Sequence, residues 1–265
     1  MKQLKSIEEF KVGIALSGGA ARGIAHIGVL KALEENGIYP EVVSGTSMGA
    51  IVGLFYTAGF SPDEMHTILR EEKFYKILGI NLKGAGLFNL KPLKEIFENK
   101  IEENNFSVLK KKFFVAVSNL NTARVEVISR GPNLFEYVIA SASIPFVFPA
   151  QHINGQTYID GGLFNNLPAE CLLGRCDRVI GVNVNHNGIV DEVKGARAIA
   201  ERSFSLALEQ NVKLSRNYCD FYIEPRKLRK FSSWEYDKVD ELVEIGYKKA
   251  KKSVEQYIVP ELQSH

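Results

Sequence analysis

The sequence predicts an α/β fold, with a mostly parallel central sheet covered by helices on both faces. Short apolar runs of strand length alternate with longer segments of helical spacing, an alternation typical of βα units around a buried parallel sheet. Glycine-rich turns join the first two runs to the helical segments that follow them. With 45% hydrophobic and 24% charged residues, the composition is that of an ordinary globular protein, which excludes disorder, collagen and coiled-coil arrays.

The beginning of the chain predicts two consecutive strand–turn–helix units. Residues 11–17 form an apolar run that ends in glycines, and residues 23–36 carry apolar side chains at helical spacing. Residues 41–44 predict the second strand, and the small and apolar residues 48–58 predict the helix after it. Together these segments form a βαβα arrangement.

The remainder of the chain continues the alternation within a single domain, residues 1–265. The segments with strand patterns are residues 113–118, 124–129, 178–184 and 220–223, and those with helical patterns are residues 198–215 and from about 233 onward. The last helix carries an apolar stripe at Val239, Leu242, Val243, Ala250 and Val254, with Gly246 on the same face. We expect this stripe to pack against the sheet, and Gly246 to let a neighbouring element approach closely.

Charge and cysteine content exclude several classes of function. The chain has 33 basic and 31 acidic residues, a formal net charge of +2, which gives no support for a nucleic-acid partner. Cys171, Cys176 and Cys219 are odd in number and lack C-x-x-C spacing, so neither a disulfide framework nor a metal site is expected. The N-terminal segment is too acidic and its apolar run too short for a signal peptide, and we expect a cytoplasmic protein. The oligomeric state stays open.

The second turn has the sequence pattern of a nucleophile elbow. Gly45, Ser47 and Gly49 match G-x-S-x-G between a strand pattern and a helix pattern. Glycines at these places allow a sharp turn that projects the serine hydroxyl from the strand end. The start of the following helix favours developing negative charge there.

The first turn is an anion site by its geometry, and its anion stays open at this point. Its small residues expose backbone N–H groups at the start of a helix, in the sequence Ser17, Gly18, Gly19, Ala20, Ala21, Arg22, Gly23. A dinucleotide pyrophosphate is one candidate, because the loop loosely matches the Rossmann fingerprint and Glu41 follows about 20 residues later. The oxyanion of an acyl-transfer intermediate is the other. A tight structural turn is the third interpretation.

A serine nucleophile needs a base, and two residues are candidates. His186 follows the strand pattern 178–184 at its carboxyl end, where α/β enzymes place functional groups. Asp160 ends another apolar segment and is followed by Gly161 and Gly162, although Asp-Gly is also a common hairpin signal.

In their order, these motifs resemble the patatin-like phospholipases. The matching segments are GGAARG at residues 18–23, GTSMG at 45–49, ASASIP at 140–145 with Phe-Pro at 148–149, DGG at 160–162 and NNLP at 165–168. The resemblance covers roughly residues 11–185. It implies a patatin-like three-layer fold and hydrolysis of lipid acyl esters by a serine–aspartate pair, without histidine, metal or cofactor.

The resemblance also assigns roles to individual residues. It implies that Ser47 is the nucleophile and Asp160 the base, in an elbow framed by Gly45 and Gly49. The oxyanion loop that it implies consists of Gly18, Gly19, Ala20, Arg22 and Gly23. Ala20 is a departure, because the family commonly has a third glycine there. If that position requires a positive φ, a methyl group distorts the loop.

Other interpretations remain beside this one. Ser47, Asp160 and His186 stand in the chain order of an α/β-hydrolase triad, and the same fold could serve as a non-catalytic lipid-binding module. Residues 74–90 are apolar with three glycines and could form a lid. The basic runs 110–112, 226–230 and 248–252 could attract an anionic membrane, so peripheral membrane contact is an open expectation.

Overall fold

The computed structural model describes residues 11–71, 90–145, 147–190 and 192–264. In these ranges eight strands form one sheet, in the order β5-β6-β3-β2-β1-β7-β8, with β4 paired to β3 beside this path. The strands are β1 (Val12–Leu16), β2 (Val42–Gly45), β3 (Lys112–Asn119), β4 (Arg124–Ile128), β5 (Gln151–Ile153), β6 (Gln156–Asp160), β7 (Arg178–Val182) and β8 (Phe221–Ile223). The five strands from β3 to β8 in this order pair in parallel, whereas β4, β5 and β6 pair antiparallel. The predicted, mostly parallel α/β sheet is therefore confirmed.

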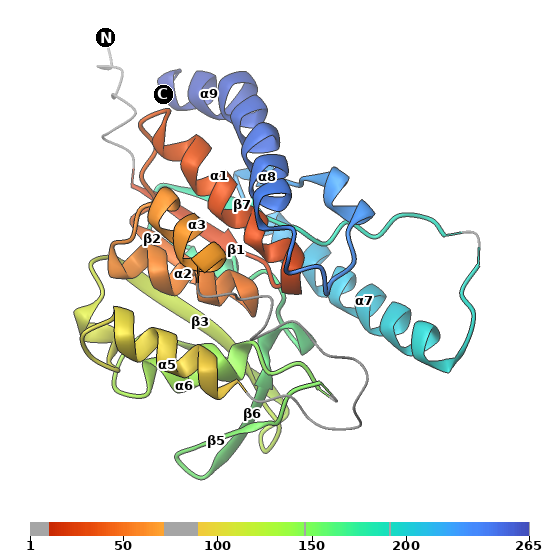
Figure 1. Ribbon diagram of the computed structural model, residues 1–265. Coiled ribbons are helices and arrows are strands. Elements are labelled where there is room, and N and C mark those ends of the chain that lie inside the picture. Colours follow the sequence, from red (N-terminus) through yellow and green to blue (C-terminus); the bar gives the residue numbers. More distant parts are fainter. Residues whose placement is uncertain (1–10, 72–89, 146, 191, 265) are drawn as a thin grey trace.

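Helices surround the sheet (Figure 1). They are α1 (Ala25–Glu34), α2 (Met48–Ala58), α3 (Pro62–Glu71), α5 (Lys91–Lys100), α6 (Leu134–Ser141), α7 (Ala196–Ser215), α8 (Val239–Ser253) and α9 (Val259–Gln263). No helix in the described ranges combines enough length with enough apolar character to cross a bilayer. The predicted lid segment, residues 74–90, lies outside the described residues except for Leu90.

Alternate residues of the same strands enter two separate cores, which shows that both faces of the sheet are covered. Ile14 and Leu16 belong to the larger core, whereas Ala15, between them, belongs to the smaller one. Successive side chains of a strand point to opposite faces. The larger core lies under α1 and α2, and the smaller one is closed by residues 167–172 and by Val212 of α7.

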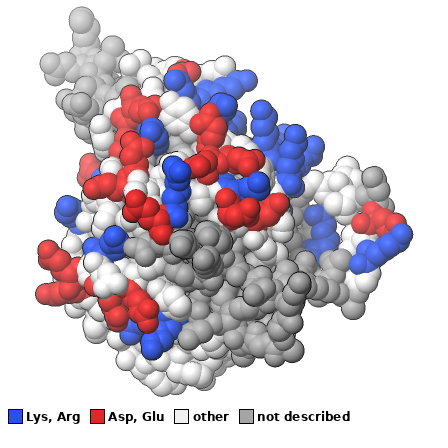
Figure 2. All heavy atoms as spheres, viewed as in Figure 1, with Lys and Arg blue, Asp and Glu red and all other residues white. Residues whose placement is uncertain are grey.

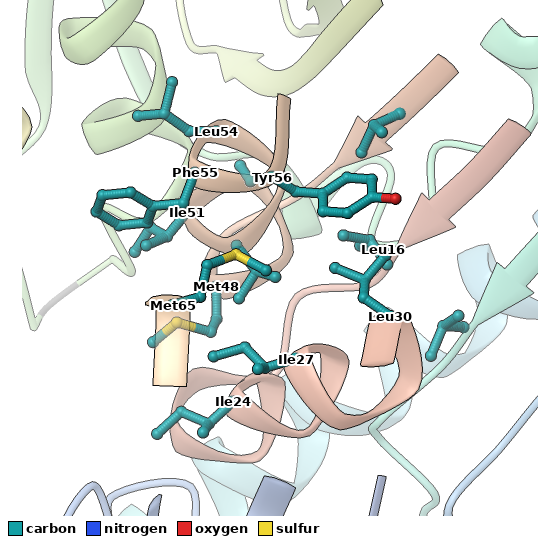
Figure 3. Close-up of a cluster of buried hydrophobic side chains, with 14 of the residues drawn as sticks. Leu16, Ile24, Ile27, Leu30, Met48, Ile51, Leu54, Phe55, Tyr56 and Met65 are labelled. Carbon is teal, nitrogen blue, oxygen red and sulfur yellow. The ribbon is translucent and has the colours of Figure 1, made fainter. Parts of the chain in front are cut away.

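The larger core joins the two strand–turn–helix units to each other. Figure 3 shows Leu16 of β1, Ile24 and Ile27 at the start of α1, and Met48 at the start of α2, gathered with Met65 of α3. These side chains are almost fully buried. The two turns are therefore carried on one packed unit, which fixes their relative position.

The apolar stripe of the last long helix packs differently from the prediction. The helix α8 lies mainly against α1, not against the sheet. A side-chain carbon placed on Gly28 would overlap the carbonyl oxygen of Val243, and one placed on Gly246 would overlap that of Ala25. The close approach expected at Gly246 is present, but its partner is a helix at the other end of the sequence.

Candidate active site

Ser47 occupies a strained turn between β2 and α2. Its backbone has φ 54° and ψ −125°, a conformation that residues other than glycine rarely adopt. A side-chain carbon on Gly45 would lie 2.5 Å from the carbonyl oxygen of Gly49. One on Gly49 would lie 2.6 Å from that of Ser17. The two glycines therefore allow the tight turn and its contact with the first turn, as the G-x-S-x-G pattern predicts.

A hydroxyl of α6 holds the strained turn in place. The backbone N–H of Ser47 donates to Ser141 Oγ at 2.9 Å, and this hydroxyl donates to the carbonyl oxygen of Ala116 in β3 at 2.7 Å. Thr46 Oγ1 also donates to the carbonyl oxygen of Asn165, at 2.8 Å. These bonds tie the turn to a neighbouring strand and to the segment after Asp160, and they offset the cost of the unusual conformation.

Asp160 ends β6, the antiparallel neighbour of β3, at the place the sequence predicts. Its backbone N–H donates to the carbonyl oxygen of Ser143, and its carbonyl oxygen accepts from Ser118 Oγ. Its Oδ1 accepts the N–H of Gly162 at 2.7 Å. A side-chain carbon on Gly161 would overlap the carbonyl oxygen of Ala116. The Asp-Gly-Gly sequence is therefore a close-packed turn that fixes one carboxylate oxygen.

The carboxyl group of Asp160 has an unusual proton affinity. Ser47 and Asp160 are each only 5% exposed. Burial raises the pKa of Asp160 to about 6, against the opposing effect of hydrogen bonds from the Gly162 N–H and the Ser47 side chain. A carboxylate with this pKa is a stronger base than an exposed one, yet it is still ionised at neutral pH.

The first turn has fewer free N–H groups than the sequence suggests. The N–H of Gly18 donates to the carbonyl oxygen of Asn166 at 3.1 Å, and that of Arg22 donates to the carbonyl oxygen of Gly19 at 3.0 Å. In the part of the chain that the structure describes, no hydrogen bond engages the N–H of Gly19 or of Ala20. In this structure the N–H groups of Gly18 and Arg22 already have acceptors within the chain, whereas those of Gly19 and Ala20 are left for an external acceptor.

Ala20 adopts the conformation that the sequence left undecided. Its φ is 46°, in the left-handed region that glycine favours. The position therefore demands a positive φ, and Ala20 meets this demand at a cost of about 1–2 kcal/mol. Gly19, in contrast, has an extended φ of 169°. A larger residue is excluded there by space, because a side-chain carbon would overlap Val184.

Arg22 and Gly23 support the first turn by contacts with neighbouring segments. Arg22 Nε donates to the carbonyl oxygen of Phe231 at 2.9 Å, and burial lowers the pKa of the Arg22 guanidinium. A side-chain carbon on Gly23 would lie 2.5 Å from Met48 Cβ. Both residues therefore fasten the turn to its surroundings, Arg22 to the C-terminal part of the chain and Gly23 to the helix after Ser47.

Two residues beside the site have roles that sequence reasoning missed. Asn166 Oδ1 lies close to both Gly18 and Gly162, because a side-chain carbon placed on either glycine would meet it. The carbon placed on Gly18 would also lie 3.0 Å from Ser47 Cβ. Its Nδ2 is buried and has no hydrogen-bond partner. Tyr236 is buried, and burial together with the charge of Asp160 raises its pKa. The NNLP match pointed to the segment of Asn166, but no sequence signal pointed to Tyr236.

Among the described residues, no histidine is hydrogen-bonded to Ser47 or Asp160. His186 Nδ1 lies 3.2 Å from Glu224 Oε2, and no hydrogen bond between described residues joins it to Ser47 or Asp160. His26 is fully buried below the first turn, where its Nε2 bonds to the carbonyl oxygen of Ser17 at 2.8 Å. Burial lowers the pKa of His26 to about 4, so it is neutral at pH 7.

The dinucleotide interpretation also lacks its acidic partner. Glu41 directly precedes β2, whereas the glycine turn follows β1, and the two strands are parallel neighbours. Glu41 therefore lies at the opposite end of the sheet from the turn. Among the described residues, no group of three or more His, Cys, Asp or Glu is arranged to hold a metal ion.

Comparisons with known proteins identify the family of the chain. The family model described as patatin-like phospholipase matches residues 14–173. A patatin-like phospholipase domain-containing protein of Caenorhabditis elegans is 26% identical over 93% of this chain, and a lysophospholipase nte1 of Aspergillus fumigatus is 31% identical over 68% of it. This chain spans only 21% and 12% of the lengths of these two relatives.

A solved structure supports the fold separately. VipD from Legionella pneumophila superposes with a TM-score of 0.61 at 16% identity, over 94% of this chain and 67% of its own. At this identity the likeness concerns the fold alone. The family model, however, covers more than half of the chain and includes both turns and the aspartate. The chain therefore belongs to the patatin-like phospholipase family.

Proposed function

We propose that this chain is a lipid acyl hydrolase in which Ser47 and Asp160 form a catalytic dyad. The observation that carries the proposal is the buried pair itself: a serine in a strained turn beside a carboxyl group whose pKa is raised to about 6 by burial. The family and the lysophospholipase name of the Aspergillus fumigatus relative support an ester of a lipid as the substrate.

The first half of the reaction forms an acyl-enzyme. Ser47 Oγ attacks the ester carbonyl carbon while Asp160 accepts the hydroxyl proton. The negative charge that develops on the carbonyl oxygen is stabilised by the free N–H groups of Gly19 and Ala20. The C–O bond to the alcohol then breaks, and Asp160 returns the proton to the departing oxygen.

The second half releases the fatty acid. Water attacks the acyl carbon, and Asp160 again accepts a proton, this time from the water molecule. The bond to Ser47 Oγ breaks, and Asp160 protonates this oxygen. Because Oδ1 of Asp160 is held by the Gly162 N–H, we propose that its other oxygen exchanges the proton with Ser47.

The dyad is tested by two substitutions and a reactive probe. Ser47→Ala and Asp160→Asn should each lower turnover of a short-chain ester by about 10³-fold or more, because such groups act as a unit. A fluorophosphonate probe should label the wild-type chain and spare Ser47→Ala. His186→Ala is the matched control and should retain near-normal turnover, since Glu224 is its partner. Near-normal turnover by either dyad variant would refute the proposal.

The same variants separate the alternatives. A loss in His186→Ala as large as that in Ser47→Ala would favour a triad. Properly folded protein that neither hydrolyses esters nor reacts with the probe would favour a lipid-binding module, for which the strained Ala20 would be the first place to look. We also propose that the enzyme reaches its lipid substrate by peripheral contact with a membrane.

A further inference from the structure

The connection between β7 and α7 exposes apolar side chains on a projecting part of the molecule. In Figure 1 this connection and the first turns of α7 extend away from the sheet. Ile189 is 100% exposed, and Val190 and Val193 in the same connection are exposed as well. Figure 2 shows uncharged side chains on the projecting part next to acidic and basic ones. Exposing such residues to water is unfavourable unless another phase or molecule covers them.

Hydrogen bonds fasten the connection to α7. Arg202 Nη2 donates to the carbonyl oxygen of Gly188 at 2.7 Å, and Ser205 Oγ donates to Asn187 Oδ1 at 2.7 Å. Asn187 Nδ2 in turn donates to the carbonyl oxygen of Ser205. The residues that precede Ile189 are therefore held by specific contacts, and these contacts present its side chain outward.

A cluster of basic residues lies directly against this connection. The short helix η7 (Arg226–Lys230) buries Leu228 and exposes its four basic side chains. A side-chain carbon placed on Gly188 would lie 3.4 Å from Arg229 Nη1. Arg226 is paired with Glu224, whereas no described carboxylate forms an ion pair with the other three basic side chains of η7.

The helix α7, to which the connection is fastened, also contacts the turn after Asp160. Asn211 of α7 donates through Nδ2 to the carbonyl oxygen of Gly162 and accepts the N–H of Asn166 at Oδ1. Leu208 packs against Gly162. The exposed apolar connection is therefore attached, through one helix, to the residues that follow Asp160.

We propose that Ile189, Val190 and Val193, together with the basic side chains of η7, form a docking face for an anionic lipid bilayer. Insertion of apolar side chains at the level of the headgroups, combined with attraction of Lys and Arg to anionic lipids, is the general way in which peripheral proteins bind membranes. Charge complementarity selects this partner. The helix η7 is basic, and Glu192 of the connection is paired with Lys194. A cavity of about 700 Å³ between α1, α3 and α8 is instead lined by five carboxylates, those of Glu35, Asp63, Asp240, Glu241 and Glu244.

Vesicle flotation tests the docking face without catalysis. The full chain with Ser47→Ala is mixed with vesicles of phosphatidylcholine alone, or of phosphatidylcholine with about one-third phosphatidylglycerol. We expect binding to the anionic vesicles that weakens as salt is raised. Binding equal on the two kinds of vesicle, or no binding to either, would overturn the proposal. The second result would leave a protein as the occupant of the face.

Paired variants in the same background locate the contact. Ile189→Asp should lower the vesicle partition coefficient about tenfold or more, since the variant replaces an inserted apolar side chain by a charged one. Leu120→Asp, at an exposed leucine in the turn between β3 and β4, should change it little. Lys227→Glu with Lys230→Glu should also lower it about tenfold or more, whereas Lys248→Glu with Lys252→Glu on α8 should have a smaller effect. Equal effects within either pair would overturn the proposal.

The proposal rests on the proposed function only in expecting that the substrate lies in the same bilayer. Turnover of a soluble short-chain ester by the otherwise wild-type chain with Ile189→Asp should be unchanged, because Ile189 contacts no residue of the dyad. If Ser47 proves unreactive while Ile189→Asp still abolishes vesicle binding, the docking face stands and the hydrolase fails. A reactive Ser47 with no vesicle binding gives the opposite result.

Discussion

Two turns of this molecule solve the same geometric problem with different residues. Each joins a parallel strand to a helix, and each holds a residue other than glycine at positive φ, 46° at Ala20 and 54° at Ser47. The turn of Ser47 is held by a side chain, Ser141, from a neighbouring helix. The turn of Ala20 is held by main-chain carbonyl oxygens of Asn166 and Ser233, which accept from Gly18 and Ala21.

The comparison separates backbone strain that the proposed chemistry needs from strain that it does not need. At Ser47 the side chain is the proposed nucleophile, so glycine, which would relieve the strain, would remove the reactive group. At Ala20 the proposed reaction uses only the backbone N–H, and glycine would serve equally well. In the proposed reaction, strain at Ser47 accompanies a reactive side chain, whereas strain at Ala20 is only tolerated.

The largest expected effect comes from breaking the contact between the two turns. Gly49→Ala places a carbon 2.6 Å from the carbonyl oxygen of Ser17 and still closer to that of Leu16. Since both neighbours are backbone, we expect a loss of about 3 kcal/mol or more in the free energy of unfolding, measured by urea denaturation. Gly188→Ala is the control, because its neighbours are atoms of the flexible Arg229 side chain. Equal stability of the two variants would contradict the rigid contact.

Measuring stability against pH tests whether the elbow, unlike the first turn, lies beside a group that titrates with a raised pKa. Because the pKa of Asp160 is raised to about 6 from 3.8, the folded chain binds more protons than the unfolded chain between these values. The contribution of Asp160 to the free energy of unfolding is therefore present at low pH and is lost as pH rises through about 6. The total change is about 3 kcal/mol. Asp160→Asn should remove this dependence when urea unfolding of the two chains is compared from pH 4 to pH 7.

Turnover should follow the same group. The ionised carboxylate is the proposed base, so hydrolysis of a soluble ester should rise with pH and level off above about 6. A pH–rate profile with no inflection between pH 4 and pH 7 would show that Asp160 does not accept the proton in the limiting step.

A smaller effect is expected at the support of the elbow. Ser141→Ala removes the acceptor of the Ser47 N–H and the donor to Ala116, leaving buried polar groups unpaired at a cost of about 1–3 kcal/mol. We expect ester turnover to fall about tenfold, because the nucleophile loses its fixed position. Ser143→Ala is the matched control, since that buried hydroxyl donates to the carbonyl oxygen of Ile139 in α6 and not to Ser47. Similar turnover by both variants would remove Ser141 from this role.

The smallest effect is expected at Ala20. Ala20→Gly relieves the left-handed strain but makes the unfolded chain more flexible, so the free energy of unfolding should rise by about 1 kcal/mol or less. Ester turnover should change by less than about threefold, because the N–H is present in both chains. If the glycine variant instead gains about 10²-fold or more in turnover, the native turn of Ala20 binds the oxyanion poorly. The two turns would then differ in catalytic fitness as well as in the contacts that hold them.

Local sequence patterns predicted the parts of the site that depend on local geometry. The strand, turn and helix around Ser47 followed from two glycines and the apolar runs on either side, and Asp160 ends a strand as expected. These features are fixed by contacts over a few residues. The helices α5 and α6 and the strand β5 were not predicted, because their patterns are short or interrupted by charged residues.

The remaining features depend on contacts distant in sequence. Which N–H groups stay free in the first turn is decided by Asn166 and Ser233, and the sequence pattern around Gly18 contains neither. The stripe of α8 predicted a buried face correctly but could not specify α1 as its partner. The exposure of Ile189 was not predicted, since an apolar residue in a loop can equally be buried.

The interlocked glycines of α1 and α8 bear on how the chain acquires activity during translation. The residues of the proposed reaction are all made by the time the ribosome reaches residue 166, yet the partner that covers α1 lies at residues 239–253. A nascent chain that has emerged only to residue 185 holds the serine, the aspartate and the free N–H groups, but it leaves one side of α1 uncovered. We expect such a chain to need a holding chaperone, and to hydrolyse esters only after the late helix has docked.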